Sequence, residues 1–231
     1  MALMGGGAAA IWHNVRPEIE DDYNHWHCHE HVLERVGIPG FLRGRRCVAI
    51  DGEPRFFHFY ETESLATLTS KPYLNRLDDP TPWTRRIGPE IRDNNRTLAE
   101  VVASFGHGLG AAILTLRLAT AEGQGERLEG WLSNEILPDL VGRLGIVGAH
   151  LLRGDRQASE TGTEEKALRE TADEIADRVL LVEAIEPHFL EALRHAELSE
   201  TALQAAGASH CTTGLYRLHF SLASDEIENQ D

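Results

Sequence analysis

Apolar and polar positions follow the same order in two successive sections of the chain. Each section starts with a short alternating stretch, residues 10–15 in the first and 112–117 in the second, and this alternation predicts a strand. An acidic stretch and an amphipathic pattern follow, over about residues 19–35 and 126–143, and predict a helix. The internal match indicates a duplicated structural unit.

The match continues beyond the first helix. Trp26 and Glu30 recur as Trp131 and Glu135, each pair spaced i, i+4. Each section then breaks at glycines and resumes with elements of the same kind. These are a basic strand (41–46 and 149–154), a third strand (55–62 and 178–184), a second helical stretch, and a last strand (about 97–105 and 215–222). The predicted order in each section is therefore β-α-β-β-α-β, the ferredoxin-like arrangement.

The predicted fold class is α+β, with ferredoxin-like halves over residues 1–108 and 109–231. A polar segment in the second half, about residues 155–177, has no counterpart in the first and is expected to be a mobile excursion with a short helix. Each half leaves one apolar sheet face bare, and two such faces can cover each other. We therefore expect an intrachain pseudo-dimeric α/β barrel whose interior could hold a small molecule, with pairing of two chains as a homodimer left open.

Composition narrows the partners. The formal net charge of −15 over 231 residues argues against nucleic acid and anionic membranes. Three widely spaced cysteines argue against a disulfide framework and favour a reducing, cytoplasmic compartment. No apolar run approaches a membrane span, and the first ten residues are expected to be a loose tail leading into the first strand.

Four of the twelve histidines lie within residues 25–31 of the first predicted helix. At 100° per residue, Trp26 belongs to the apolar stripe, and Glu30 falls within it. His27 and His31 lie together on one flank with Asn24 in line, while the other two histidines lie on the opposite flank.

The second half indicates which of these residues the scaffold needs. His27 and His31 are replaced there by Leu132 and Ile136, so both imidazoles are candidates for proton transfer near neutral pH. Glu30 would orient or tune them. Solvated or capping histidines are the alternative. The spacing from His27 to His31 also fits the H-x-x-E-H zinc-peptidase pattern, but no third ligand for such a site is apparent. A plain zinc or iron site using His27, His31 and a strand histidine is an alternative. We expect neither a metal nor another cofactor.

Further candidates lie on the predicted strands and one loop. His13 alternates with apolar residues on the first strand, where Thr115 is expected to replace it in the second half. His58 and Tyr60 share one face of the third strand and could line a cavity opposite the helix. Arg46, with two neighbouring arginines, could bind a substrate carboxylate, or pair with surface acids. Trp83, in a proline-stiffened loop, could form a rim or simply pack.

Several segments of the first half resemble the EthD-like branch of the dimeric α/β-barrel proteins. They are residues 24–31, 34–35, 38–41, 45–46, 68–70 and 80–86. The resemblance implies a ferredoxin-like fold with a cavity under the first helix. It also implies membership among decarboxylases, isomerases, cyclases and cofactor-free oxygenases of small, often aromatic compounds. The family's Glu-His pair matches Glu30 and His31, and His27 stands where members often have tyrosine.

The predicted function is a cofactor-independent lyase, decarboxylase or isomerase. His31 or His27 would move a proton on a small aromatic or carboxylated substrate, with His13 or His58 stabilising developing negative charge. The alternatives are a cofactor-free or metal-assisted monooxygenase and a non-catalytic small-molecule-binding protein.

Overall fold

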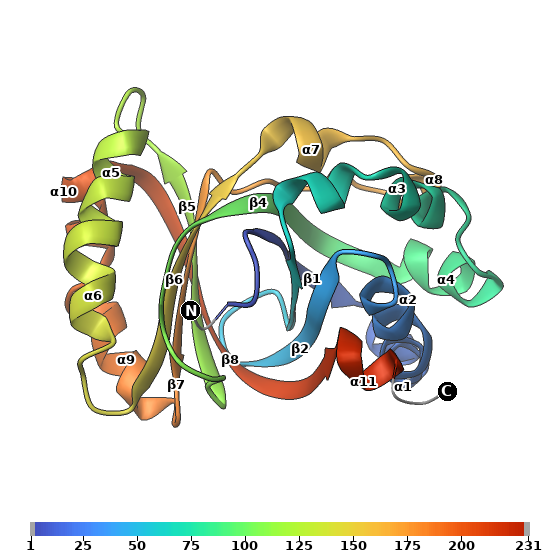
Figure 1. Cartoon of the computed structure of the whole chain (residues 1–231), viewed down its shortest axis with the longest axis horizontal. Coiled ribbons are helices and arrows are strands. Elements are labelled where there is room, and N and C mark those ends of the chain that lie inside the picture. Colours follow the sequence, from blue (N-terminus) through green and yellow to red (C-terminus); the bar gives the residue numbers. More distant parts are fainter. Residues whose placement is uncertain (1–2, 229–231) are drawn as a thin grey trace.

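The computed structural model describes residues 3–228, which form a closed barrel of eight antiparallel strands (Figure 1). The strands are β1 (Gly7–Val15), β2 (Phe41–Asp51), β3 (Phe56–Thr62), β4 (Ile91–Gly106), β5 (Ala112–Thr120), β6 (Ile146–Gly154), β7 (Arg178–Ala184) and β8 (Ala208–Ala223). Around the barrel their order is β1-β3-β2-β8-β5-β7-β6-β4.

This strand order contains two ferredoxin-like sheets, β4-β1-β3-β2 and β8-β5-β7-β6. They join edge to edge where β2 pairs with β8 and β4 pairs with β6. Closure leaves no open edge strand among residues 3–228. The predicted α+β fold, a pseudo-dimeric barrel within one chain, is therefore confirmed, and the boundary expected near residue 108 falls between β4 and β5.

The helices gather in two groups on opposite sides of the barrel (Figure 1). The first half contributes η1 (Pro17–Ile19), α1 (Glu20–Trp26), η2 (His27–His31), α2 (Val32–Val36), η3 (Leu65–Thr69), α3 (Lys71–Asp78), α4 (Pro82–Ile87) and η4 (Gly88–Glu90). The second half contributes α5 (Gly125–Trp131), η5 (Leu132–Ile136), α6 (Leu137–Leu140), α9 (His188–His195) and α10 (Glu200–Ala206), followed by α11 (Ser224–Glu228) after the last strand.

The two predicted amphipathic helices each contain a π-helical turn at the same place. The turns are η2 and η5, and each directly follows the repeated tryptophan, Trp26 or Trp131. A π turn adds a residue to the helical repeat and is found often at functional sites. Its presence in both halves shows that it belongs to the duplicated scaffold.

The barrel interior is filled by side chains from both halves. Trp12 stacks on Phe57 with ring centroids 4.7 Å apart, and Phe59, Leu181 and Tyr216 pack around them. The prediction that the barrel interior could hold a small molecule is therefore wrong, because these large side chains fill it. The expected loose tail is also wrong for the described residues, since Leu3 is buried in this cluster and residues 7–10 are strand; Met1 and Ala2 lie outside the described residues.

The insertion (residues 155–177) packs against the first half rather than forming a free excursion. It holds two short helices, α7 (Arg156–Glu160) and α8 (Glu164–Ala167), and α8 lies beside α3 (Figure 1). Its ends are tied to β4, where the Asp155 amide donates to the Leu98 carbonyl at 2.8 Å and the Glu174 amide to the Asn94 carbonyl at 3.0 Å.

Within residues 3–228, no helix combines the length and apolar character that a membrane crossing needs.

Candidate active site

A cavity lies between the first-half helix and the sheet face turned toward it. Its volume is about 60 Å³, which holds only a few waters. Its walls come from β1, the helix α1-η2-α2, β2, β3, α3, β4 and the insertion. They are Ile11, His13, Trp26, His27, His31, Arg35, Phe41, His58, Tyr60, Tyr73, Leu77, Ile91, Asn94, Arg96, Glu165 and Arg169.

Strand alternation decides which side chains reach this cavity. On β1, Trp12 points into the barrel and His13 toward the helix; on β3, Phe57 and Phe59 point into the barrel and His58 toward the helix. The first-half helix contributes His27, His31 and Arg35 from one face, so each is one turn from the next. The pattern in the sequence thus places imidazoles from three elements around one space.

Tyr23 links two of these imidazoles. Its hydroxyl oxygen lies 2.8 Å from His13 Nε2 and 2.7 Å from His58 Nε2, and all three side chains are buried. A hydroxyl has one proton, so Tyr23 donates to one ring and accepts from the other. The accepting ring must then carry its proton on Nδ1, while the donating ring has a bare Nδ1.

The other two histidines continue the cluster. The ring centroids of His27 and His58 are 4.0 Å apart, those of His13 and His58 4.9 Å, and those of His27 and His31 5.5 Å. None of the four Nδ1 atoms has a hydrogen-bond partner among the described residues. Buried polar atoms are normally satisfied, so these nitrogens are available to a bound molecule.

Burial keeps the four imidazoles neutral. It lowers the pKa of His13 to about 3, with help from Arg169 and Arg46. Burial likewise holds the pKa values of His27, His31 and His58 well below the ordinary 6.5, and nearby histidines and arginines add to the shift. Burial raises the pKa of Tyr23 well above its ordinary value. At neutral pH the cluster therefore offers uncharged bases and hydrogen-bond donors.

Six predicted site residues line the cavity: His13, Trp26, His27, His31, His58 and Tyr60. The other four lie outside its walls: Asn24, Glu30, Arg46 and Trp83. Glu30 accepts from the Thr81 hydroxyl at 2.6 Å, and Trp83 donates to Asp22 at 3.0 Å.

Arg46 lies behind the cluster. Its guanidinium donates to Asn24 and sits over the ring of Phe56, 5.0 Å from the centroid, and over that of Tyr23 at 5.7 Å. This geometry lets Arg46 hold Tyr23 in place, whereas a direct role for Arg46 in binding substrate stays a prediction. Within residues 3–228, no group of three or more His, Cys, Asp or Glu side chains is arranged to hold a metal ion.

Sequence reasoning missed Tyr23, which bridges two of the imidazoles, and four residues of the cavity wall, Arg35, Arg96, Glu165 and Arg169. Tyr23 lies one helical turn before His27, and this spacing was a usable signal for a shared site. Arg35 stands one turn after His31 in the same way. Glu165 and Arg169 belong to the insertion, whose place over the first half no local pattern reveals.

The second half is an internal comparison for the whole cluster. The matching π turns and the equal strand pairings align the two halves, with Ala10 opposite Phe59 as Thr115 is opposite Leu181. Seven cavity or cluster residues then have apolar counterparts. His13, Tyr23, His27, His31, Arg35, His58 and Tyr60 correspond to Leu118, Leu128, Leu132, Ile136, Leu140, Leu180 and Val182.

These counterparts pack together as the hydrophobic core of the second half. The scaffold therefore needs none of the seven polar side chains. The alignment also corrects the expectation that Thr115 replaces His13. Thr115 faces the barrel interior, where its hydroxyl accepts from the Trp12 indole at 3.3 Å, whereas His13 faces the helix.

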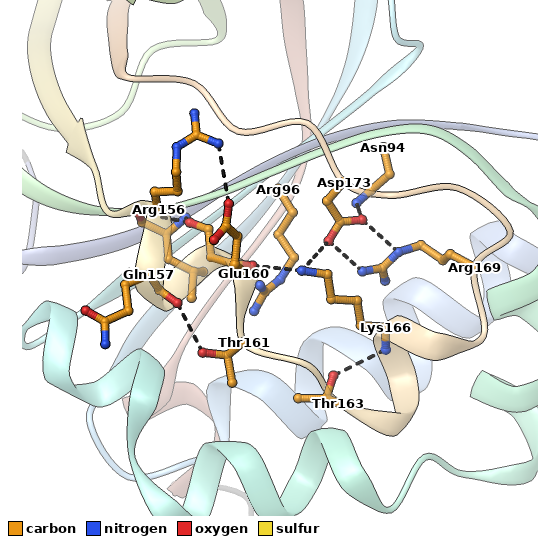
Figure 2. Close-up of polar contacts among 12 residues, drawn as sticks. Asn94, Arg96, Arg156, Gln157, Glu160, Thr161, Thr163, Lys166, Arg169 and Asp173 are labelled. Atoms are coloured by element: carbon orange, nitrogen blue, oxygen red, sulfur yellow. Dashed lines mark hydrogen bonds and ion pairs between the residues drawn. The ribbon is translucent and has the colours of Figure 1, made fainter.

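The insertion contributes two charged side chains to the cavity wall, Glu165 and Arg169. Figure 2 shows the polar contacts that hold Arg169 and its neighbours. Asp173 accepts from Asn94 at 2.7 Å and pairs with Arg169 through both carboxylate oxygens, at 3.1 and 2.9 Å. Lys166 approaches the same carboxylate at 3.7 Å. This network fixes Arg169 at the cavity wall beside Arg96.

Known proteins match this chain in fold and not in sequence. No protein-family model matches it, and no curated protein does so. An anthrone oxidase-like protein superposes with a TM-score of 0.61 at 12% identity, covering 94% of this chain and 92% of its own. A protein of Fusobacterium nucleatum, provisionally named a monooxygenase, gives 0.60 at 10% identity with 96% of both chains covered.

A similarly named protein from Lactobacillus acidophilus gives 0.58 at 5% identity, covering 95% of this chain and 97% of the other. These similarities establish the dimeric α+β-barrel fold. The EthD-like subgroup stays a prediction.

Proposed function

We propose that this chain is a small-molecule oxygenase whose histidine-lined cavity deprotonates a small aromatic substrate for reaction with O₂. The observation that carries the proposal is the buried Tyr23 hydroxyl between His13 and His58. The names of the structurally similar proteins support oxygenation over the lyase chemistry that the sequence favoured. The barrel closes within one chain, so the site needs no second copy; homodimer formation and a cytoplasmic location stay predictions.

The tyrosine bridge creates two different groups side by side. One of His13 and His58 presents a bare Nδ1, and the other presents Nδ1–H. The bare nitrogen can accept a proton from an acidic C–H or phenol, because the negative charge that develops on the substrate raises the imidazole pKa that burial lowers. The N–H can donate to the oxygen on which this charge develops. His27 and His31 extend this set along the helix, where either can relay the proton.

The electron balance of this reaction closes without another reductant. An activated CH₂ flanked by aromatic rings, as in an anthrone, loses two hydrogens and gains one oxygen to become C=O. The second oxygen atom of O₂ leaves as water with those two hydrogens. The protein has to supply the base, the oxyanion donor and a dry enclosure, and the walls of Trp26, Phe41 and Tyr73 provide the last.

Lyase or isomerase chemistry would share the first step, because it too begins with proton removal from carbon. The two functions separate afterwards, since only the oxygenase consumes O₂. A metal-assisted oxygenase would show a stoichiometric metal in elemental analysis of the purified chain. A pure binding protein would retain ligand and release no product.

The test uses a panel of phenolic aromatics with acidic C–H groups, assayed by oxygen electrode and by mass spectrometry of products made under ¹⁸O₂. We expect O₂ uptake with one labelled oxygen in the product. The double variant H27L/H31I, which copies the second half, should lose turnover yet keep its fold, while H25A/H29A on the opposite flank should retain it. Product without O₂ uptake would move the assignment to a lyase or isomerase.

A further inference from the structure

Arg35 is a buried cation at the cavity wall with an incomplete set of partners. Its side chain is 4% exposed, and one guanidinium nitrogen donates to Glu165. The other terminal nitrogen, Nη1, has no hydrogen bond among the described residues, and Glu34 Oε2 lies 4.0 Å from it. The second half has Leu140 at this position, so the fold does not require a charge there.

Glu165 reaches Arg35 from the other half of the molecule. It is carried by α8, a helix of four residues in the middle of the insertion. The insertion is held by backbone hydrogen bonds at both ends, while near its middle the Glu164 amide donates to Asp78 at 3.1 Å. Glu165 thus places a carboxylate inside the cavity from a segment that crosses over it.

The charges around the cavity favour an anion. Arg35, Arg96 and Arg169 line it together with one carboxylate, Glu165. Arg169 already donates through two of its nitrogens to the two carboxylate oxygens of Asp173. Arg96 donates to the Tyr73 hydroxyl at 2.9 Å. Arg35 differs from both, because its partner Glu165 lies in the cavity wall, where the carboxylate of a ligand could also lie.

From these contacts, which rest on the function proposed above, we propose that Arg35 binds the carboxylate of an aromatic acid substrate. Glu165 takes that place when no substrate is bound. A guanidinium recognises a carboxylate through two parallel N–H donors, and Arg35 has a donor to spare. Because His31 lies one helical turn from Arg35, a carboxylate held there directs the attached ring toward His31 and His27. The ring would be enclosed by Trp26, Phe41, Tyr60 and Tyr73.

The size of the cavity agrees with displacement of Glu165. A volume of about 60 Å³ holds only a few waters, which is too little for a benzene ring with a carboxylate. Movement of Glu165 and α8 would open space at the Arg35 end, and the incoming carboxylate would replace the ion pair that is lost. The cover would then open for acids in preference to neutral aromatics of the same shape.

The experiment measures binding of benzoate and of its neutral analogue benzamide to the full chain by isothermal titration calorimetry. Wild type should prefer benzoate. The variant E165Q removes the competing carboxylate and should bind benzoate about tenfold tighter, equal to about 1.4 kcal/mol, with little change for benzamide. The neighbouring E164Q is the matched control, because Glu164 is exposed, and it should bind as wild type does.

The double variant R35L/E165Q removes both partners and copies the leucine of the second half, so it should fold and lose the preference for benzoate. Retained preference in that variant, or E165Q binding benzoate no tighter than wild type, would overturn the proposal. The readout is binding alone. If the protein oxygenated neutral aromatics but did not bind benzoate, this inference would be refuted and the proposed function would stand. If it bound benzoate through Arg35 but oxygenated no substrate, the proposed function would fail and this inference would stand.

Discussion

Arg45 of β2 donates to Glu183 of β7 across the junction of the two halves, with 2.7 Å between Nη1 and Oε1. Both side chains are almost completely buried. Arg45 also approaches Glu61 at 3.4 Å, and His150 approaches Glu183 at 3.5 Å. In the alignment of the halves, Glu61 corresponds to Glu183 and Arg45 corresponds to His150. Each half therefore has one glutamate beside one basic residue, and the contact between Arg45 and Glu183 joins the two pairs.

Removing Arg45 should destabilise the protein strongly. Burial alone would raise the pKa of Glu183, but Arg45 and His150 lower it to about 2. The variant R45M leaves this carboxylate poorly compensated, and we expect a loss of about 3–5 kcal/mol in the free energy of unfolding, measured by urea denaturation. The exposed pair Arg156 and Glu160 is the control, since R156M should cost less than about 1 kcal/mol.

Tyr23 should matter far more for chemistry than for folding. Y23F keeps the ring and its packing but leaves His13 and His58 without their shared hydroxyl, at a cost of about 1–3 kcal/mol in stability. Because the bridge fixes which Nδ1 carries a proton, turnover should fall by about 10²–10⁴-fold. Steady-state kinetics beside thermal melts would test this. If Y23F lost this much stability but kept the turnover of wild type, the role assigned to the bridge would be contradicted.

The histidine cluster should make stability depend on pH. The folded-state pKa of His13 is about 3, and those of His27, His31 and His58 are also lowered from 6.5. Below pH 6.5 these histidines bind protons in the unfolded chain but stay neutral in the folded chain. The free energy of unfolding that comes from burying them in neutral form is therefore fully present above pH 6.5 and is lost as the pH falls.

Each buried histidine should contribute a slope of about 1.4 kcal/mol per pH unit within its window. Urea denaturation between about pH 7 and 5 should show a shallower slope for H27L/H31I than for wild type. An identical slope in the two proteins would show that those imidazoles are not held neutral.

Gly44 brings the first-half helix close to β2. A Cβ at this position would lie 3.0 Å from side-chain atoms of Val32, Val36 and Tyr60. We expect G44A to cost about 1–3 kcal/mol and to impair activity by shifting the helix that carries the histidines. The counterpart in the second half is Ala149, and A149G should leave activity unchanged. Kinetic and melting measurements on both variants decide this.

The duplicated architecture could be predicted because local patterns repeat. Strand alternation, helical periodicity and the recurring Trp26 and Glu30 gave the element order, and pairing of bare sheet faces gave the closed barrel. The location of the binding space could not be predicted in the same way. Alternation divides β1 and β3 into two faces, but only packing shows that Trp12 and Phe57 fill the barrel while His13 and His58 meet beneath the helix.

The candidate site was predictable where residues share one element. His27 and His31 could be identified as candidates from their helical spacing and from the apolar residues that replace them in the second half. Partners from distant elements had no local signal: Glu165 meets Arg35 across 130 positions of sequence. The alignment of the halves by initial sequence similarity was also off by three residues on the first strand. Thr115 and His13 therefore looked equivalent until strand pairing separated them.

The route of the insertion makes the two halves depend on each other in one direction only. A half that supplies the roof of its neighbour's chamber cannot be lost or swapped without exposing that chamber, even though its own equivalent chamber has filled with leucines. Two identical subunits would each carry both the chamber and the insertion, so only the fused chain can give one half the chamber and the other half its roof.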